Sequence, residues 1–194
     1  MKSFALTILA AAILLSSANV RADDNFHPSR ARLLVHSEYD VNDETHLRVN
    51  FIPAGNLLAG IAPLAYLGLG WQATSWLDIE GTLGWCFKAN EPIVSTRLTF
   101  KIDDFYSWID LEIQLPGESG YWFAQAEYKL LDWIHVGVEG EGWGSYIGET
   151  PWSNGGGPNL LFRLGKVGLD LALHVRELGD SVKPEFFARV HLFL

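Results

Sequence analysis

The sequence predicts an all-β fold, a transmembrane antiparallel up-and-down β-barrel of about 10 to 12 strands. Apolar and polar residues alternate with a period of two along most of the chain, which is typical of strands with one apolar face. The connections between these segments alternate between short and long, as they do in membrane barrels. No apolar run reaches the roughly 18 residues that a membrane helix needs, although 48% of the residues are hydrophobic.

The first residues, Met1 to Ala22, have the organisation of a secretory signal peptide. Lys2 supplies the positive end, Phe4 to Leu15 form the apolar core, and Val20 to Ala22 resemble a cleavage site. We therefore expect residues 1–22 to be removed and residues 23–194 to form one exported barrel domain.

The exported chain is acidic. Removal of Lys2 and Arg21 leaves 12 basic against 23 acidic residues, a net charge of −11. This balance argues against a nucleic-acid partner. Cys86 is the only cysteine, so no intramolecular disulfide can form. Gly137 to Gly142 is glycine-rich but lies within a predicted strand, so it predicts no dinucleotide site, and we expect no cofactor.

In the first half of the chain, each alternating segment is bounded by turn residues such as Gly, Pro, Asn and Asp. Ile109, Leu111 and Ile113, for example, alternate with Asp110 and Glu112. The strands predicted in this half are Arg30 to Glu38, His46 to Phe51, Ala65 to Gln72, Leu77 to Trp85, Val94 to Lys101 and Trp108 to Leu115.

The second half continues the pattern, with Gly144 to Gly157 as the longest predicted loop and Glu177 to Lys183 as another. The strands predicted here are Tyr121 to Leu130, Trp133 to Trp143, Asn159 to Gly165, Val167 to Arg176 and Pro184 to Leu194. The total is about eleven, whereas single-chain bacterial barrels have even numbers. We therefore expect 10 or 12 strands, and we place the error in the count near the N-terminus.

The last predicted strand has one apolar face, formed by Phe186, Ala188, Val190 and Leu192. Such a strand after a secretory signal resembles the C-terminal strand of small bacterial outer-membrane β-barrel proteins. In that class the final residue is usually aromatic, whereas here it is Leu194. The resemblance implies a location in the outer membrane of a Gram-negative cell, contact with outer-membrane lipid, and assembly by the barrel assembly machinery through this strand.

Aromatic residues fall near both predicted ends of the barrel, which resembles two interfacial aromatic girdles. Those near the short turns are Trp76, Phe105, Tyr106, Trp133 and Phe193, and those near the long loops are Trp85, Trp122, Trp143, Tyr146 and Phe186.

The polar faces of the strands carry charges of both signs, which predicts a charge-paired lumen. Asp78 and Glu80 should neighbour Arg97 and Lys101, and these in turn should neighbour Asp110 and Glu112. The predicted lumen charges are Arg48, Asp78, Glu80, Arg97, Lys101, Asp110, Glu112, Glu127, Glu139, Glu141, Arg163, Asp170, Arg176 and Arg189, together with Arg30, Arg32, Glu38 and Lys129.

This lumen suits a porin-like narrow pore, or a structural barrel braced by ion pairs whose loops meet partners. By composition, the expected contact loop is Gly144 to Gly157, which carries Tyr146 and Trp152. An alternative is a soluble periplasmic β-sandwich or lipocalin-like carrier, in which the apolar face lines a ligand cavity.

Histidines are predicted on the inner face at positions 36, 46, 135, 174 and 191. If the last strand pairs with the first, His36, His46 and His191 lie near one end of the barrel. Three imidazoles there would form a candidate transition-metal site or pH switch, with hydrogen-bonded lumen histidines as the alternative.

A second alternative is an outer-membrane lipid-modifying enzyme with a Ser/His/acid site. Such a site needs its nucleophile and base where lipid head groups reach. The long loops contain no histidine. Their serines are Ser119, Ser145, Ser153 and Ser181. We therefore expect no catalytic residues.

Overall fold

The computed structural model describes residues 30–42, 47–56, 62–115, 119–148 and 150–194, and side chains for the same residues except 39, 42, 47–56 and 62. The expected signal peptide lies outside this part of the chain. Within it the structure forms eleven strands: β1 (Arg30–Asn42), β2 (Leu47–Asn56), β3 (Ala62–Thr74), β4 (Leu77–Cys86), β5 (Glu91–Ile102), β6 (Phe105–Gln114), β7 (Ser119–Leu131), β8 (Ile134–Gly144), β9 (Ser153–Leu164), β10 (Val167–Leu178) and β11 (Ser181–Phe193). The all-β prediction is confirmed.

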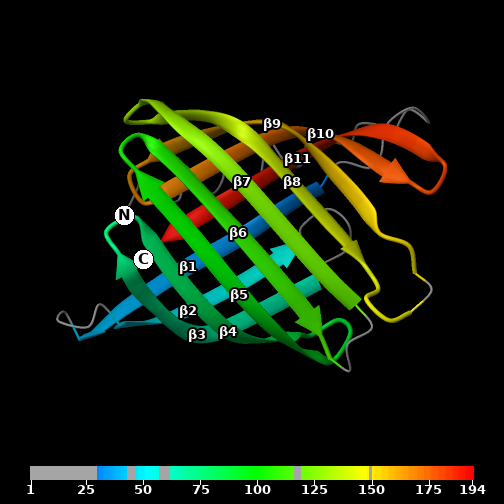
Figure 1. Ribbon diagram of the computed structural model, residues 1–194, viewed down its shortest axis with the longest axis horizontal. Helices are drawn as coiled ribbons and strands as arrows, with labels where there is room; N and C mark the ends of the chain where they lie inside the picture. The colour runs from blue at the N-terminus through cyan, green and yellow to red at the C-terminus, as the bar shows by residue number, and fades with distance from the viewer. Residues whose placement is uncertain (1–29, 43–46, 57–61, 116–118, 149) are drawn as a thin grey trace, which may run out of the picture.

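The strands close into a barrel in which each pairs with its neighbours along the chain. Figure 1 shows β5 to β8 crossing the near wall and β1 and β11 side by side on the far wall. Every pairing between consecutive strands is antiparallel, as expected of an up-and-down arrangement.

The pairing that closes the barrel is parallel. It joins β1 to β11 from Arg30, opposite Phe187, to His36, opposite Phe193. With eleven strands running alternately up and down, the first and last must run in the same direction, so their contact cannot be antiparallel. The eleven alternating segments counted in the sequence thus match the eleven strands described. The inference from eleven to an even number of strands is wrong.

The barrel buries charged side chains in its interior and exposes apolar side chains on its outer surface. Leu83 is 70% exposed and Val175 is 59% exposed, whereas Asp170 is 1% exposed and Arg176 fully buried. Because successive side chains of a strand point to opposite faces, the alternation seen in the sequence sends charged residues into the lumen and apolar residues outward.

Two-residue turns at one end of the barrel connect β3 to β4, β5 to β6, β7 to β8 and β9 to β10. We call this the short-turn end. Gly165 and Asp103 adopt left-handed backbone conformations in two of these turns, with φ of 64° and 51°. No helix among the described residues is long and apolar enough to cross a membrane.

Two predicted loops at the opposite end are shorter than expected. Ser153 already begins β9, so the glycines Gly155 to Gly157 belong to that strand rather than to a flexible loop. β10 and β11 are joined by a tight turn at Gly179 and Asp180, with a φ of 62° at Gly179. Pro184 therefore lies inside β11 and does not begin it.

Three aromatic residues assigned to the interfacial girdles lie inside the barrel instead. Tyr106 and Phe193 line a lumen pocket. The ring of Trp143 lies against buried arginines. Each shares the strand parity of inward charges, and proximity to a turn in sequence did not reveal this parity.

Candidate functional site

The candidate site is the barrel lumen, which contains a buried cluster of four charges that we call the ionic plug: Arg30, Glu141, Arg176 and Glu185. Arg176 donates from Nη2 to Glu141 Oε1 at 2.6 Å and from Nε to Glu185 Oε2 at 2.6 Å. Arg30 donates to both carboxylates as well. Two guanidinium groups thus balance two carboxylates, as buried charges require.

An aromatic ring and a glycine complete the surroundings of the plug. The Cζ atoms of Arg176 and Arg30 lie 4.0 and 4.8 Å from the ring centre of Trp143. Gly155 lies directly opposite Arg176 in the β9–β10 register, and a Cβ at that position would lie 2.8 Å from Arg176 Cζ. The absence of a side chain at Gly155 makes room for the guanidinium.

A second layer of charges lies beneath the plug. Arg189 donates to both Glu139 and Asp170. His174 is fully buried, and its Nε2 lies 2.8 Å from Glu139 Oε1. Its other ring nitrogen lies 3.8 Å from Glu185, which connects the second layer to the plug.

Amide side chains extend this network toward the middle of the lumen. Gln125 donates to Asp170 at 3.0 Å and to Glu127 at 2.7 Å. Asn159 donates to the same two carboxylates at 3.2 and 2.8 Å. Hydrogen bonds to carboxylates are among the stronger ones in proteins, so the amides also brace the interior.

The opposite wall carries the ion pairs expected between β4, β5 and β6. Lys101 lies 2.9 Å from Asp78, and Arg97 lies 2.9 Å from Asp110 and 4.0 Å from Glu80. These pairs join neighbouring strands, where opposite charges stabilise the sheet.

The remaining predicted lumen charges have varied surroundings. Glu112 accepts a hydrogen bond from Tyr66 at 3.1 Å. Arg32 donates to Tyr121, which in turn donates to Glu141. The side chain of Arg48 lies outside the described part of the structure.

Near the plug, β1, β3, β4 and β5 contribute an apolar cluster instead of charges. Leu34, Tyr66, Cys86 and Ile93 pack together there, with Leu64 against them. The only cysteine is therefore a buried packing residue.

His36 and His191 meet across the parallel β1–β11 pairing. Their rings stack with centroids 5.3 Å apart, and His36 Nε2 lies 3.1 Å from His191 Nδ1. Phe193 stacks on His36 at 5.0 Å. The two imidazoles share a hydrogen bond, which occupies one ring nitrogen of each, and His46 lies outside the described residues.

A different group of residues has the spacing of metal ligands. Ligand atoms of Glu141, His174 and Glu185 lie within 4.8 Å of one another, all buried. However, Arg30 and Arg176 already donate to both carboxylates. Two guanidinium charges therefore stand where a dication would need to be, so this group fits an ion-pair cluster better than a metal centre.

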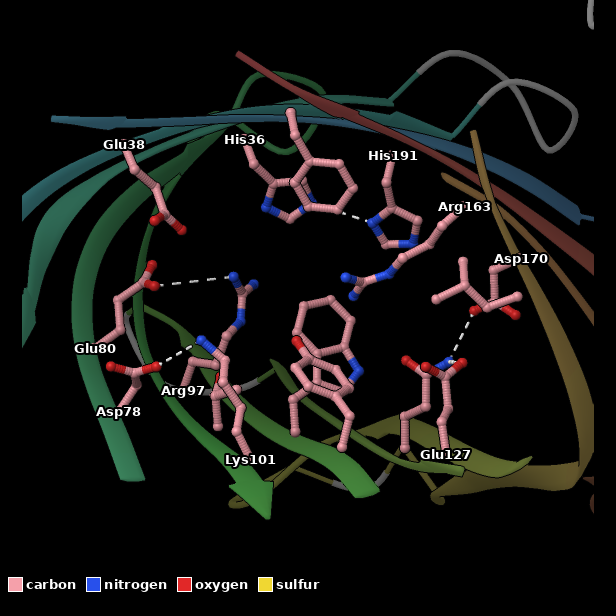
Figure 2. Close-up of a pocket in the computed structure, with 16 residues that line it drawn as sticks. His36, Glu38, Asp78, Glu80, Arg97, Lys101, Glu127, Arg163, Asp170 and His191 are labelled. Atoms are coloured by element: carbon pink, nitrogen blue, oxygen red, sulfur yellow. Dashed lines mark hydrogen bonds and ion pairs between the residues drawn. The ribbon is translucent and has the colours of Figure 1, made fainter. Parts of the chain in front are cut away.

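Toward the short-turn end the lumen contains a pocket with a volume of about 100 Å³. Figure 2 shows Arg163 reaching into its centre, with Asp78, Glu80 and Arg97 on one side and Glu127 and Asp170 on the other. Lys101 at its rim is half exposed, which places the opening at this end.

Three of the four serines considered for catalysis form hydrogen bonds with the main chain. Ser153 Oγ donates to the carbonyl of Glu177 and Ser181 Oγ to that of Leu178, while Ser145 Oγ accepts from the amide of Gly148. None of these three hydroxyls is bonded to a histidine in the described part of the chain. The expectation of a non-enzymatic protein remains a prediction.

Sequence reasoning missed several lumen residues. Glu185 lies within the predicted strand Pro184 to Leu194 and shares the parity of Arg189 and His191, so parity alone marks it as inward. Asn159 likewise shares the parity of Arg163 on β9. The inward direction of Trp143 follows from the parity of Glu141.

No protein-family model matches the chain, and comparison with curated proteins finds no similar sequence.

Proposed function

We propose that the chain is a non-enzymatic outer-membrane β-barrel with a blocked lumen, a structural or interaction barrel rather than a pore. The observation that supports this most strongly is the inverted polarity of the barrel. Outward residues such as Leu67, Leu83 and Val138 are more than half exposed, while inward charges such as Glu127 and Asp170 are buried.

Water on the outside would make this arrangement unfavourable. A soluble protein rarely exposes a continuous apolar surface, and it has no reason to bury charges in its interior when its surface is available for them. Hydrocarbon on the outside reverses both preferences, because lipid accepts Leu83 and Val138 and excludes charge. The lipocalin-like alternative requires an apolar interior, which the ionic interior of the described barrel does not provide.

The ionic plug favours a blocked barrel over a pore. Arg176, Glu141 and Glu185 are fully buried, and the apolar cluster around Ile93 fills the same half of the barrel. A conducting lumen of an eleven-stranded barrel would instead leave such side chains in contact with water.

Site-directed spin labelling tests which surface faces lipid. In a Cys86→Ala background, one nitroxide would be attached at Leu83→Cys on the outer face and another at Lys166→Cys in a short turn. After refolding into vesicles, the label at position 83 should collide with oxygen but not with a water-soluble nickel complex, and the label at 166 should collide with the nickel complex. Equal access of the nickel complex to both positions would contradict the proposal.

A further inference from the structure

The pocket near the short-turn end has the features of a binding site that the ionic plug does not share. Its floor is formed by inward residues of the network, including Gln125 and Asp170, while Lys101 reaches solvent at its rim. The pocket is therefore open at one end and closed at the other.

Arg163 differs from four of the other inward arginines. The guanidinium groups of Arg30, Arg97, Arg176 and Arg189 each lie within ion-pair distance of a carboxylate. Arg163 has no carboxylate within that distance among the described residues. Its Cζ lies 5.7 Å from the ring centre of Tyr106 and 5.9 Å from that of Phe193.

Hydrogen-bond donors without acceptors gather in the same pocket. Within the described structure, Nε of Arg163, Nε of Arg97 and the indole Nε1 of Trp108 are buried and have no hydrogen-bond partner. All three residues line the pocket. A buried donor without an acceptor is costly, so this part of the pocket favours a ligand that supplies oxygen lone pairs.

Carboxylates also line the pocket, and several have ion-pair partners, including Glu80 at 4.0 Å from Arg97, whereas Oε2 of Glu127 is buried without a hydrogen bond among the described residues. Asp78 pairs with Lys101, and Asp170 pairs with Arg189. Glu127 accepts hydrogen bonds from two amides and lies 3.9 Å from His135. Among the described residues, the guanidinium of Arg163 lies within ion-pair distance of no carboxylate.

We propose that the pocket binds a small aliphatic monocarboxylate, whose oxygens lie among the donors of Arg163 and Trp108. The volume of about 100 Å³ admits only a few heavy atoms and is well below that of a drug-sized site. Leu161 and Phe193 supply apolar wall for a short alkyl chain. Arg–carboxylate hydrogen bonds are charge-assisted, so Arg163 dominates the affinity.

The side of the membrane from which this ligand enters depends on the proposed function. In outer-membrane barrels short turns face the periplasm, so the ligand would come from there. Binding itself needs only the folded barrel, so the test below can fail while the membrane proposal stands, and the reverse also holds.

The experiment is a titration of detergent-refolded protein with propionate, followed by NMR of the indole N–H of Trp108. That signal is assigned by its loss in Trp108→Phe. Propylammonium, which has nearly the same shape and the opposite charge, is the matched probe at constant ionic strength. Propionate should shift the signal saturably, and propylammonium should not.

Two variants connect the effect to Arg163. Arg163→Gln should weaken propionate binding by at least about tenfold, whereas Lys166→Gln in the adjacent turn should leave it unchanged. An unaltered propionate response in Arg163→Gln would overturn the proposal. A saturable response to propylammonium, or no response to propionate, would also overturn the proposal. Both of these results are measured on the unmodified protein, so they do not depend on whether the variants fold.

Discussion

Nε of Arg176 on β10 lies 2.6 Å from Oε2 of Glu185 on β11, and both side chains are fully buried. Glu185 also accepts from Arg30 on β1. The carboxylate therefore connects an antiparallel hairpin to the parallel pairing that closes the barrel. The plug thus braces the one pairing, among the described strands, that joins strands distant in the sequence.

The first prediction is that Glu185→Gln strongly destabilises the barrel. The substitution leaves one carboxylate, Glu141, for two buried guanidinium groups. Removal of one partner from a buried ion pair costs about 3–5 kcal/mol. Reversible urea unfolding in lipid vesicles, followed by tryptophan fluorescence, measures the free energy of unfolding.

The control for that prediction is Asp180→Asn, in the exposed turn next to β11. It removes the same charge from the same region and should change the free energy of unfolding by less than about 0.5 kcal/mol. Equal effects of the two substitutions would show that Glu185 has no special structural role.

The second prediction concerns two glycines in strands. Gly155→Ala places a methyl group 2.8 Å from Arg176 Cζ and should displace that guanidinium from its carboxylates, at a cost of about 1–3 kcal/mol. Gly81→Ala meets nothing within 4 Å and should stabilise the barrel slightly, since Gly in a strand is less favourable than Ala. The same unfolding measurement compares them, and a neutral Gly155→Ala would mean that the guanidinium has room to move.

The third prediction tests the outer surface through stability. Leu83→Arg places a charge on the outward face of β4 and should cost about 2–4 kcal/mol if that face meets hydrocarbon. Val182→Arg, outward at the end of β11, should cost no more than about 1 kcal/mol because it lies near the membrane edge. A Leu83→Arg variant as stable as the unmodified protein is the result expected of a face in water.

The fourth prediction is that the barrel does not conduct. Refolded protein in planar bilayers should give no conductance steps above background, because the ionic plug and the Ile93 cluster fill one half of the lumen. Insertion would be verified separately by protection of the barrel from protease. Reproducible single-channel steps from inserted protein would contradict a blocked lumen and restore the pore hypothesis.

The strand pattern was readable from the sequence because the period of two depends only on which side of the sheet each residue occupies. Alternation located nearly every strand and placed Asp170 and Arg189 on one face. Counting the alternating segments also gives the observed strand number, whereas the rule that such barrels have even numbers gives a wrong one. No local sequence pattern indicates that the pairing of the first and last strands is parallel. That direction follows from the odd number of strands alone.

The site was harder to predict because distant contacts depend on strand tilt and stagger around the barrel. Alternation indicates that Arg30 and Glu141 face inward, but not that they meet. The glycines after Asn154 predict a loop, although a barrel strand accommodates them. This interpretation leaves out Gly155, which makes room for Arg176, whereas Glu185 lies within the predicted final strand and its parity marks it as inward.

The most direct test of the central claim is fractionation of cells expressing the full chain, followed by gel electrophoresis of boiled and unboiled samples. We predict a band in the outer-membrane fraction whose mobility shifts on boiling, because a closed barrel with a braced β1–β11 pairing resists detergent until heated. A band in the soluble periplasmic extract with no shift would contradict it.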